Sequence, residues 1–309
     1  MLDQQALLRN DYFTFTKERR RKETYNRPLA QVLFNKLDQK LWLDRIMPSV
    51  APPMTHYVAG TDLVDVTDGS RHPFEIVHYH LEQYGELFLK PSGEGQGRGA
   101  YRLALQDGVG LVNGKRVDLS SWLDGFKRTS PSGYTISRII SQTQWSGVFF
   151  PPTLNTLRVL TGTHHSDHRP VLLAATMKMG RPSTIPTDNW KVGRGGVAAR
   201  VMTNTGQLQS GLFYNAETGR RETVANHPDS GAQIEGNVVP NWNSVKETML
   251  ELAALLPFPG LVGWDVALTE AGLMIVEANT GPGLDIHQCH GSLRETPEQV
   301  AFWKEMRML

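Results

Sequence analysis

The chain has 309 residues, of which 39% are hydrophobic and 20% charged, and its formal net charge is +1. This composition is enough for a large buried core and gives no electrostatic reason to expect a nucleic-acid or acidic membrane surface as a partner. The single cysteine, Cys289, excludes an intramolecular disulfide. Because the sequence also lacks a long apolar segment and a signal-peptide pattern, we expect a cytoplasmic protein without a membrane partner.

The first part of the chain predicts a helical region. Leu33, Leu37 and Leu41 recur at helical spacing, and a proline-rich segment over residues 47–53 interrupts the pattern. We therefore expect an N-terminal helical region over residues 1–53.

A small unit of one helix and an antiparallel sheet is expected next, over residues 54–140. Asp107-Gly108 and Asn113-Gly114 are typical of tight hairpin turns. The other expected elements are a helix at 74–84 and strands at 86–90 and 100–105.

A glycine-rich loop, PSGEGQGRG over residues 91–99, follows Lys90 in this unit. Glycines allow backbone N–H groups to approach an anion closely, and a lysine at the edge of the loop adds a point charge for phosphate. The loop lacks the Gly-Lys-Ser/Thr ending of a Walker A motif and precedes a strand rather than a long helix. It predicts a flap between two strands, and the alternative is a flexible hairpin without a function.

The remaining residues, 141–309, predict a larger unit in which strands and helices mix without a regular βαβ order. This pattern favours an α+β fold over a doubly wound sheet. The expected strands are 156–161, 171–179 and 196–202, and the expected helices are Ser244–Leu256, capped by Asn243 or Ser244, and Pro297–Met308.

A hairpin near the C-terminus concentrates carboxylates. The turn over residues 269–272 places Asp265 opposite Glu277, and the alternation of a strand puts Glu277 and Asn279 on one face. Two carboxylates facing each other across a strand pair repel, unless a divalent cation such as Mg²⁺ lies between them. The alternative is that Glu277 is the solvated end of a strand and Asp265 caps a loop.

Taken together, these segments resemble the ATP-grasp superfamily, and most closely its sugar-transfer-associated branch, which is related to glutamate-ligase-like enzymes. The resemblance spans roughly residues 35–290 and implies a small glycine-flap subdomain over a larger antiparallel-sheet core. The segments that carry it are FLKPS at 88–92 with its loop, NTLRV at 155–159, DNWKVGRGGV at 188–197, GWDVA at 263–267 and VEANTGPGLDIHQ at 276–288.

The resemblance implies a role for each matching residue. Asp265, Glu277 and Asn279 are expected to hold one or two Mg²⁺ ions on the phosphates of ATP. Lys90 is expected to contact these phosphates from the flap, and Lys40 to supply a second lysine, for which Lys36 is a competitor.

The same resemblance assigns catalytic and nucleotide contacts. With Lys90, the expected catalytic residues are Arg158, which would face the transferred phosphate, and Arg194, which would line the substrate pocket. Judged without the resemblance, Arg158 is a surface residue of a strand and Arg194 belongs to a plain turn. The expected nucleotide contacts are Ser92, Gly93, Gly95 and Gly97 of the loop, and Ser137 and Ile139 of the segment that links the two subdomains.

One departure from the family pattern affects ribose recognition. The linking segment has Ser137 and Arg138 where the family usually places two acidic residues. Either the nucleotide sits differently, or its affinity is lower, or another acid substitutes.

The implied activity is an ATP-dependent carboxylate–amine ligase that forms an amide or peptide bond through an acyl phosphate, with small-molecule carboxylate and amine substrates. The alternatives are a phosphotransferase on the same scaffold and a nucleotide-binding module without catalysis. The sequence is compatible with an oligomer. A histidine-rich segment, HHSDH at 164–168, is expected to be a polar loop, with an independent metal site as the alternative.

Overall fold

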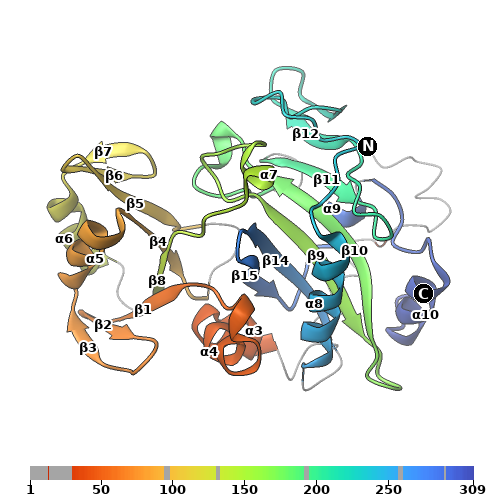
Figure 1. Ribbon diagram of the computed structural model, residues 1–309, viewed down its shortest axis with the longest axis horizontal. Helices are drawn as coiled ribbons and strands as arrows, with labels where there is room; N and C mark the ends of the chain where they lie inside the picture. The colour runs from red at the N-terminus through yellow and green to blue at the C-terminus, as the bar shows by residue number, and fades with distance from the viewer. Residues whose placement is uncertain are drawn as a thin grey trace.

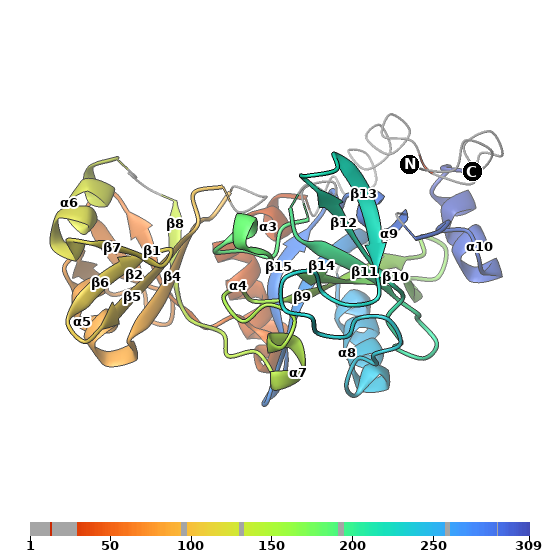
Figure 2. The same cartoon turned by 90° about the horizontal axis from the view of Figure 1, so that it is seen from above.

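The computed structural model describes residue 13 and residues 30–93, 98–129, 133–190, 195–256, 260–288 and 290–309. Two antiparallel sheets form two lobes side by side, and helices α3 (Ala30–Phe34) and α4 (Lys36–Ile46) lie between them (Figures 1 and 2). The α+β prediction is confirmed. Most of the expected N-terminal helical region falls outside the described residues.

The small lobe holds an eight-stranded sheet with the strand order β3-β2-β1-β8-β4-β5-β6-β7. Its turns follow the sequence signals: Asp107-Gly108 and Asn113-Gly114 all have φ between 50° and 77°, the left-handed backbone of tight hairpins. Its strands are β1 (Met54–Ala59), β2 (Asp62–Asp65), β3 (Arg71–Pro73), β4 (Glu86–Pro91), β5 (Tyr101–Gln106), β6 (Val109–Val112), β7 (Lys115–Val117) and β8 (Tyr134–Arg138).

Two helices cover one face of the small sheet and complete its core. Val77 and Leu81 of α5 (Ile76–Tyr84) and Phe126 of α6 (Leu119–Thr129) pack among buried residues of the strands. The helix and strands predicted for this unit are therefore present, with bounds within two residues of those expected.

The large lobe holds a seven-stranded sheet with the order β13-β12-β11-β10-β9-β14-β15. The central strands β9, β10 and β14 are buried along almost their whole length, which requires cover on both faces. The strands are β9 (Thr156–Thr163), β10 (Pro170–Met179), β11 (Val197–Val201), β12 (Gly211–Asn215), β13 (Arg220–Val224), β14 (Leu261–Thr269) and β15 (Gly272–Asn279).

Helices supply this cover from opposite sides. Val159 of β9 belongs to a cluster with residues of α8 (Trp242–Ala254), whereas the next residue, Leu160, belongs to a cluster with Phe302 of α10 (Pro297–Glu305). Successive residues of a strand point to opposite faces, so α8 covers one face of the large sheet and α10 the other. The remaining short helical segments are η1 (Pro48–Val50), α7 (Gln144–Gly147), η2 (Pro182–Thr184) and α9 (Asp285–Gln288).

Three predicted helix bounds in the large lobe are wrong, and one of them is the end of α8, which lies at Ala254 instead of Leu256. Helix α8 begins at Trp242, before the predicted Ser244, and its N-cap residue is Asn241 instead of Asn243 or Ser244. The Trp242 indole is buried and donates a hydrogen bond to the Thr203 carbonyl, so tertiary packing fixes this end of the helix. Helix α10 ends at Glu305 instead of Met308, and the left-handed backbone of Arg307 follows it.

The hairpin of β14 and β15 has the predicted pairing of Asp265 with Glu277, and a β-bulge is needed to reach it. Thr269 pairs with Gly272 and Val266 with Ile275, so Val276 is an extra residue between two pairs. A bulge of this kind leaves one residue out of the regular ladder of cross-strand pairs and changes the direction in which the neighbouring side chains point. Here it brings the two carboxylates opposite each other and leaves Val276 as the residue without a cross-strand partner in this hairpin.

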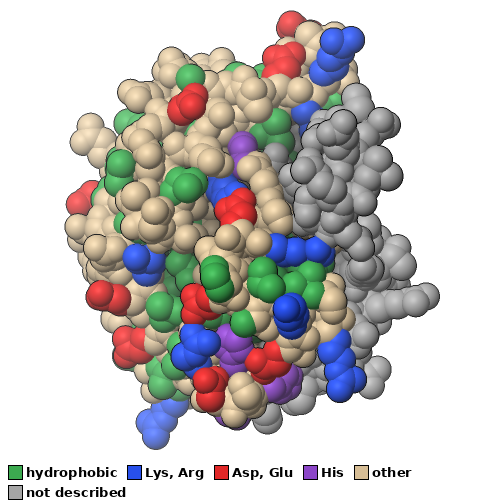
Figure 3. Space-filling view, turned by 90° about the vertical axis from the view of Figure 1, so that its right-hand side faces the viewer, with side chains coloured by type: hydrophobic (Ala, Val, Ile, Leu, Met, Phe, Trp, Pro, Cys, Tyr) green, Lys and Arg blue, Asp and Glu red, His purple; other side chains and the backbone are tan. Residues whose placement is uncertain are grey.

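None of the helices that the structure describes has both the length and the hydropathy of a bilayer-spanning segment. On the end of the molecule near α10, acidic and basic side chains are interspersed among polar and apolar ones (Figure 3). The described part of this face has no broad area of a single charge.

The packing of α10 against β9 can be tested at Gly162. A Cβ atom at this position would lie 2.3 Å from the ring of Phe302, which is fully buried. We expect Gly162→Ala to destabilise the protein by about 1–3 kcal/mol, since the core must shift to accept the methyl group. A calorimetric melt should show a lower Tm.

Gly125 in α6 provides the control, because a Cβ atom there would meet nothing within 4 Å. Gly125→Ala should leave the Tm unchanged or raise it, since alanine favours a helix by about 1 kcal/mol over glycine. An unchanged Tm for Gly162→Ala would contradict the described packing of α10.

Candidate functional site

A cavity of about 590 Å³ lies between the two lobes and takes its walls from both. The small lobe contributes β4, β5 and the end of β8, and the large lobe contributes β9, β10, β14 and β15. The ionisable side chains that line it are Lys36, Glu86, Lys90, Arg98, Arg102, Arg138, Arg158, Lys178, Asp188, Asp265 and Glu277. Seven of these are cationic and four anionic, so the described lining favours an anionic ligand.

Asp265 is the centre of a buried ion cluster on the large sheet. Its Oδ1 and Oδ2 accept hydrogen bonds from Nε and Nη2 of Arg158 at 2.7 and 2.9 Å, and the Lys178 Nζ lies 3.0 Å from Oδ1. Burial raises the pKa of Asp265, but Arg158 and Lys178 outweigh it and hold the pKa at about 2. Asp265 is therefore ionised throughout the neutral pH range.

Strand pairing produces this cluster. Asp265 pairs with Arg158 on one side and with Glu277 on the other, and Arg158 pairs in turn with Thr176. These residues form one row across four strands, on the face of the sheet opposite α8. Cross-strand neighbours on one face are close enough for long side chains to interact, so the row brings opposite charges together.

Lys178 and Asp188 extend the cluster, and the sequence analysis missed both. Asp188 accepts hydrogen bonds from the amide and hydroxyl groups of Thr156 at 2.9 and 2.5 Å, and the Lys178 Nζ lies 3.2 Å from its Oδ1. Burial lowers the pKa of Lys178, but the two carboxylates outweigh it and raise the pKa above its ordinary value. A lone lysine in the apolar run of residues 171–179 was the signal that could have identified it.

Lys90 reaches the site from the small lobe. Its Nζ donates a hydrogen bond to the carbonyl of Val276, the bulge residue, at 3.0 Å. Burial lowers the pKa of Lys90 to about 8, against the opposing effect of Glu277. The bulge thus gives this lysine a neutral acceptor beside the carboxylates of the large sheet.

The predicted metal ligands lie together on the cavity wall. The Glu277 side chain is 25% exposed and its Oε1 lies 3.6 Å from the Lys36 Nζ, farther than a hydrogen bond. Asn279 donates through its Nδ2 to the Gly263 carbonyl at 3.3 Å, which orients its amide. With Asp265 these residues offer carboxylate and carboxamide oxygens, the donors that Mg²⁺ prefers, so the set fits a hard cation.

The structure distinguishes between Lys36 and Lys40, which the sequence offered as alternatives for the second lysine of the nucleotide site. Lys36 is part of the cavity wall, whereas Lys40 pairs with Asp44 on its own helix and is absent from that wall. The geometry therefore gives no support to a role for Lys40. Gln39, between them, accepts a hydrogen bond from the Ala278 amide at 3.1 Å and holds α4 against β15.

The predicted nucleotide contacts are only partly brought together. Ser137 and Ile139 line the cavity, but Ser92 and Gly93 do not. Ser92 instead joins backbone segments, since its amide donates to Gly133 and its carbonyl accepts from Lys36. Three further predicted residues, Gly95, Gly97 and Arg194, lie outside the described residues.

An acidic side chain near the linking segment was also missed. Glu86 lines the cavity and accepts hydrogen bonds from the Arg102 Nη2 at 2.9 and 3.0 Å. Arg102 also donates to the Pro152 carbonyl at 3.2 Å, which joins the two lobes at this edge. Arg138 lines the same region, with its guanidinium 5.7 Å from the centre of the Tyr84 ring.

Comparison with solved structures gives similarities at low sequence identity. D-alanyl-alanine synthetase A from Vibrio cholerae is 14% identical over 89% of this chain and 65% of its own, with a TM-score of 0.46. L-amino acid ligase from Bacillus licheniformis is 11% identical over 81% of this chain and 41% of its own, with a TM-score of 0.38. The ATP-grasp ligase PsnB, in complex with a phosphomimetic precursor variant, Mg and ADP, is 13% identical over 91% and 61%, with a TM-score of 0.42.

This chain spans less than two thirds of the length of each of these three proteins. No curated protein matches its sequence. The family model for sugar-transfer associated ATP-grasp proteins matches residues 127–301, which is more than half of the chain and includes β9, β10, β14 and β15. The chain belongs to the sugar-transfer associated ATP-grasp family.

Proposed function

We propose that this protein is an ATP-dependent carboxylate–amine ligase that forms an amide or peptide bond through an acyl phosphate. One observation carries the proposal: cations from both lobes converge with an oxygen-donor set around a single cavity. Lys90 comes from the small sheet, Arg158 and Lys178 come from the large sheet, and Asp265, Glu277 and Asn279 lie beside them. Membership of the ATP-grasp family supports ATP as the phosphate donor.

The nucleotide would occupy the side of the cavity formed by the linking segment. Ser137 and Ile139 would contact the base or sugar, and Glu86 is the carboxylate on this wall that could take the ribose hydroxyls if Arg102 released it. The phosphates would then extend toward Lys90 and Arg158. Asp265, Glu277 and Asn279 would hold Mg²⁺, which supplies positive charge against the phosphate oxygens.

In the first step a substrate carboxylate oxygen attacks the γ-phosphorus, and the bond from that phosphorus to the β-phosphate oxygen breaks. The products are an acyl phosphate and ADP. Two anions must approach each other, so catalysis depends on charge neutralisation and in-line positioning. Lys90 and Arg158 contribute charge from opposite lobes, and no side-chain nucleophile is required.

In the second step the amine nitrogen attacks the carbonyl carbon, the bond to the phosphate oxygen breaks, and the nitrogen loses a proton. Water must be kept from the acyl phosphate until the amine arrives. The resemblance to ATP-grasp proteins implies that the glycine-rich loop after Lys90 would do this, although residues 94–97 lie outside the described part of the chain.

The first test is Mg²⁺-dependent release of ADP from ATP in the presence of pooled carboxylates and amines, with mass spectrometry of the products. Glu277→Gln should lower the rate by about 10²–10³-fold, the usual cost of losing an electrostatic contact to a transition state. Glu270→Gln, an exposed position in the turn of the same hairpin, is the matched control and should retain the parental rate.

The products separate the proposal from its alternatives. An amide together with ADP and phosphate supports the ligase. ADP with a phosphorylated acceptor and no amide would establish a phosphotransferase instead. Nucleotide binding without turnover in any pool, equally in the parent and in Glu277→Gln, would contradict catalysis.

The lowered pKa of Lys90 predicts a pH dependence of nucleotide binding. The nucleotide attracts the protonated form of Lys90, so its affinity should be constant below a pH of about 8, the pKa of this residue. Above that pH, affinity should fall by up to about tenfold per pH unit as the free protein loses the charge. Calorimetric titration of ADP in the presence of Mg²⁺ between pH 7 and pH 9, roughly one unit either side of the pKa, would measure this change in affinity.

Lys90→Arg is the control, because a guanidinium stays charged over this range. Its affinity for ADP should show no step near the pKa of Lys90, whatever its absolute value. A step of equal size in both proteins would assign the pH dependence to another group.

A further inference from the structure

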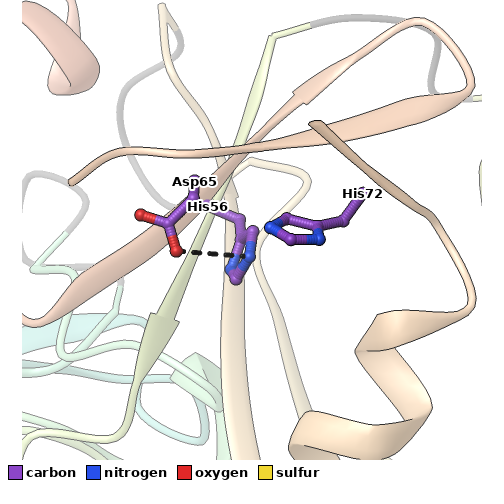
Figure 4. Close-up of side chains that lie close together, drawn as sticks. All are labelled: His56, Asp65 and His72. Atoms are coloured by element: carbon purple, nitrogen blue, oxygen red, sulfur yellow. Dashed lines mark ion pairs between the residues drawn. The ribbon is translucent and has the colours of Figure 1, made fainter. Parts of the chain in front are cut away.

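A second group of metal-binding side chains lies on the small sheet, away from the cavity. His56 of β1, Asp65 at the end of β2 and His72 of β3 each offer a ligand atom, and these atoms lie within 4.8 Å of one another (Figure 4). It is the one such group of histidine, cysteine and carboxylate side chains found among the described residues. None of the three lines the cavity.

Strand register places these residues on one face. His56 pairs with Asp65, Val58 pairs with Leu63, and Leu63 pairs with His72. Since alternate residues of a strand share a face, the three side chains lie on the face that carries the buried Val58 and Leu63. Helix α5 packs on this same face.

The carboxylate is already oriented toward the histidines. Oδ1 of Asp65 accepts a hydrogen bond from the Thr67 amide at 2.7 Å, and Oδ2 lies 3.8 Å from Nε2 of His56. Nε2 of His72 lies 2.9 Å from the Ser70 hydroxyl, which orients this ring. In metal sites, hydrogen bonds of this kind fix the orientation of the side chains that bind the metal directly.

Helix α5 contributes a further histidine. The ring centre of His80 lies 4.8 Å from that of His56. Both ring nitrogens of His80 and Nδ1 of His56 are buried without a hydrogen-bond partner among the described residues. Buried polar atoms without partners are costly, and an imidazole pair of this kind suggests a ligand that protein groups do not supply.

We propose that His56, Asp65 and His72 bind a structural Zn²⁺ ion, with His80 as the fourth ligand after rotation of its ring. A tetrahedral Zn²⁺ with ligands at about 2.0–2.2 Å needs ligand atoms about 3.3–3.6 Å apart. The His56–Asp65 separation of 3.8 Å is close to this, and the 4.8 Å limit of the group requires only small side-chain movements. Three nitrogens and one carboxylate favour Zn²⁺ over Mg²⁺.

The ion would join three short strands at the edge of the sheet to the helix that covers them. Strand β3 has only three residues, and two of these are exposed, so packing alone stabilises this edge weakly. A metal that binds the folded edge and not the unfolded chain stabilises it by mass action.

In the HHSDH segment, by contrast, both ring nitrogens of His164 have partners. Nδ1 of His164 lies 2.6 Å from Oε2 of Glu305, and Nε2 lies 3.3 Å from the Arg169 guanidinium. The better candidate for a metal site is therefore the group with His56, His72 and His80, which are separated in the sequence, and not the HHSDH segment.

The test uses the full chain without a histidine tag, freed of metal by a chelator. Zn²⁺ is titrated calorimetrically into the Glu277→Gln variant, so that the carboxylates of the cavity contribute less to binding. We expect one Zn²⁺ per chain and, at a hundredfold excess over Kd, a rise in Tm of roughly 4 °C. His72→Ala and His80→Ala in this background should each weaken binding by about a hundredfold or more, as expected from the loss of a ligand.

His78→Ala is the matched control, because His78 lies on the same helix, is exposed and faces Glu82. It should bind Zn²⁺ as the Glu277→Gln variant does. Binding of ADP in the otherwise unchanged chain reports that each histidine variant is folded. Co²⁺ in place of Zn²⁺ should give the intense visible absorption of a tetrahedral site, lost in His72→Ala.

Two results would overturn the proposal. One is the absence of Zn²⁺ binding in the Glu277→Gln variant. The other is equal affinity in the His72→Ala, His80→Ala and His78→Ala variants, which would place the ion elsewhere.

Discussion

The ion cluster around Asp265 is the constraint on which the site depends. Arg158 and Lys178 lie on the central strands β9 and β10, and nearly all of the remaining residues of these strands are buried. Without Asp265, Arg158 would lose both of its hydrogen bonds to a carboxylate in a setting where an unpaired charge is very unfavourable. A buried ion pair is a poor source of stability, because the cost of desolvation offsets most of the attraction between the charges. What the cluster provides is fixed, ionised groups at the floor of a cavity.

Among the described residues, several hydrogen bonds to backbone acceptors join the two lobes. Lys90 donates to Val276 across the cavity, and Arg102 donates to Pro152 at its edge. The Lys36 amide donates to the carbonyl of Ser92 and ties α4 to the end of β4. Single hydrogen bonds of this kind contribute about 1 kcal/mol each, so each of these contacts can be broken at a small cost in free energy. This would suit the proposed ligase, whose cavity must open to admit substrates and close to exclude water.

The sequence predicted what depends on local pattern. The Asp265–Glu277 pairing followed from alternation and from a turn signal, and it is present because a bulge at Val276 compensates for a two-residue turn. The glycine turns and the strands around them also followed from local signals. The N-cap of α8 did not, because burial of Trp242 determines where that helix begins.

Residues that act through long-range contacts could not be predicted in the same way. Asp188 and Lys178 are ten positions apart, and they join the site because Lys178 lies within ion-pair distance of both Asp188 and Asp265. The contact with Asp265 depends on the register of β10, β9 and β14. Lys36 and Lys40 are one turn apart and share a side of α4, so the choice between them depends on the position of each along the helix relative to the cavity. The histidines of the small sheet were missed because no two of them are close in the sequence, whereas the adjacent histidines of the HHSDH segment attracted attention.

The chain thus contains two donor sets of different chemical character, and this difference has a consequence for how they would be used. The cavity set, with Asp265 and Glu277, consists of oxygens and sits beside cations, so it suits a weakly held Mg²⁺ that arrives with phosphates. The set on the small sheet, with His56 and His72, is rich in nitrogen and is enclosed by α5, so it suits a tightly held ion that stays through every turnover. An ion that fixes β1 to β3 would also act on β8, because β1 is the neighbour of β8 in the sheet and His56 pairs with Ile136. The ion would therefore stiffen the strand that leads into the linking segment, whose Ser137 and Ile139 line the cavity.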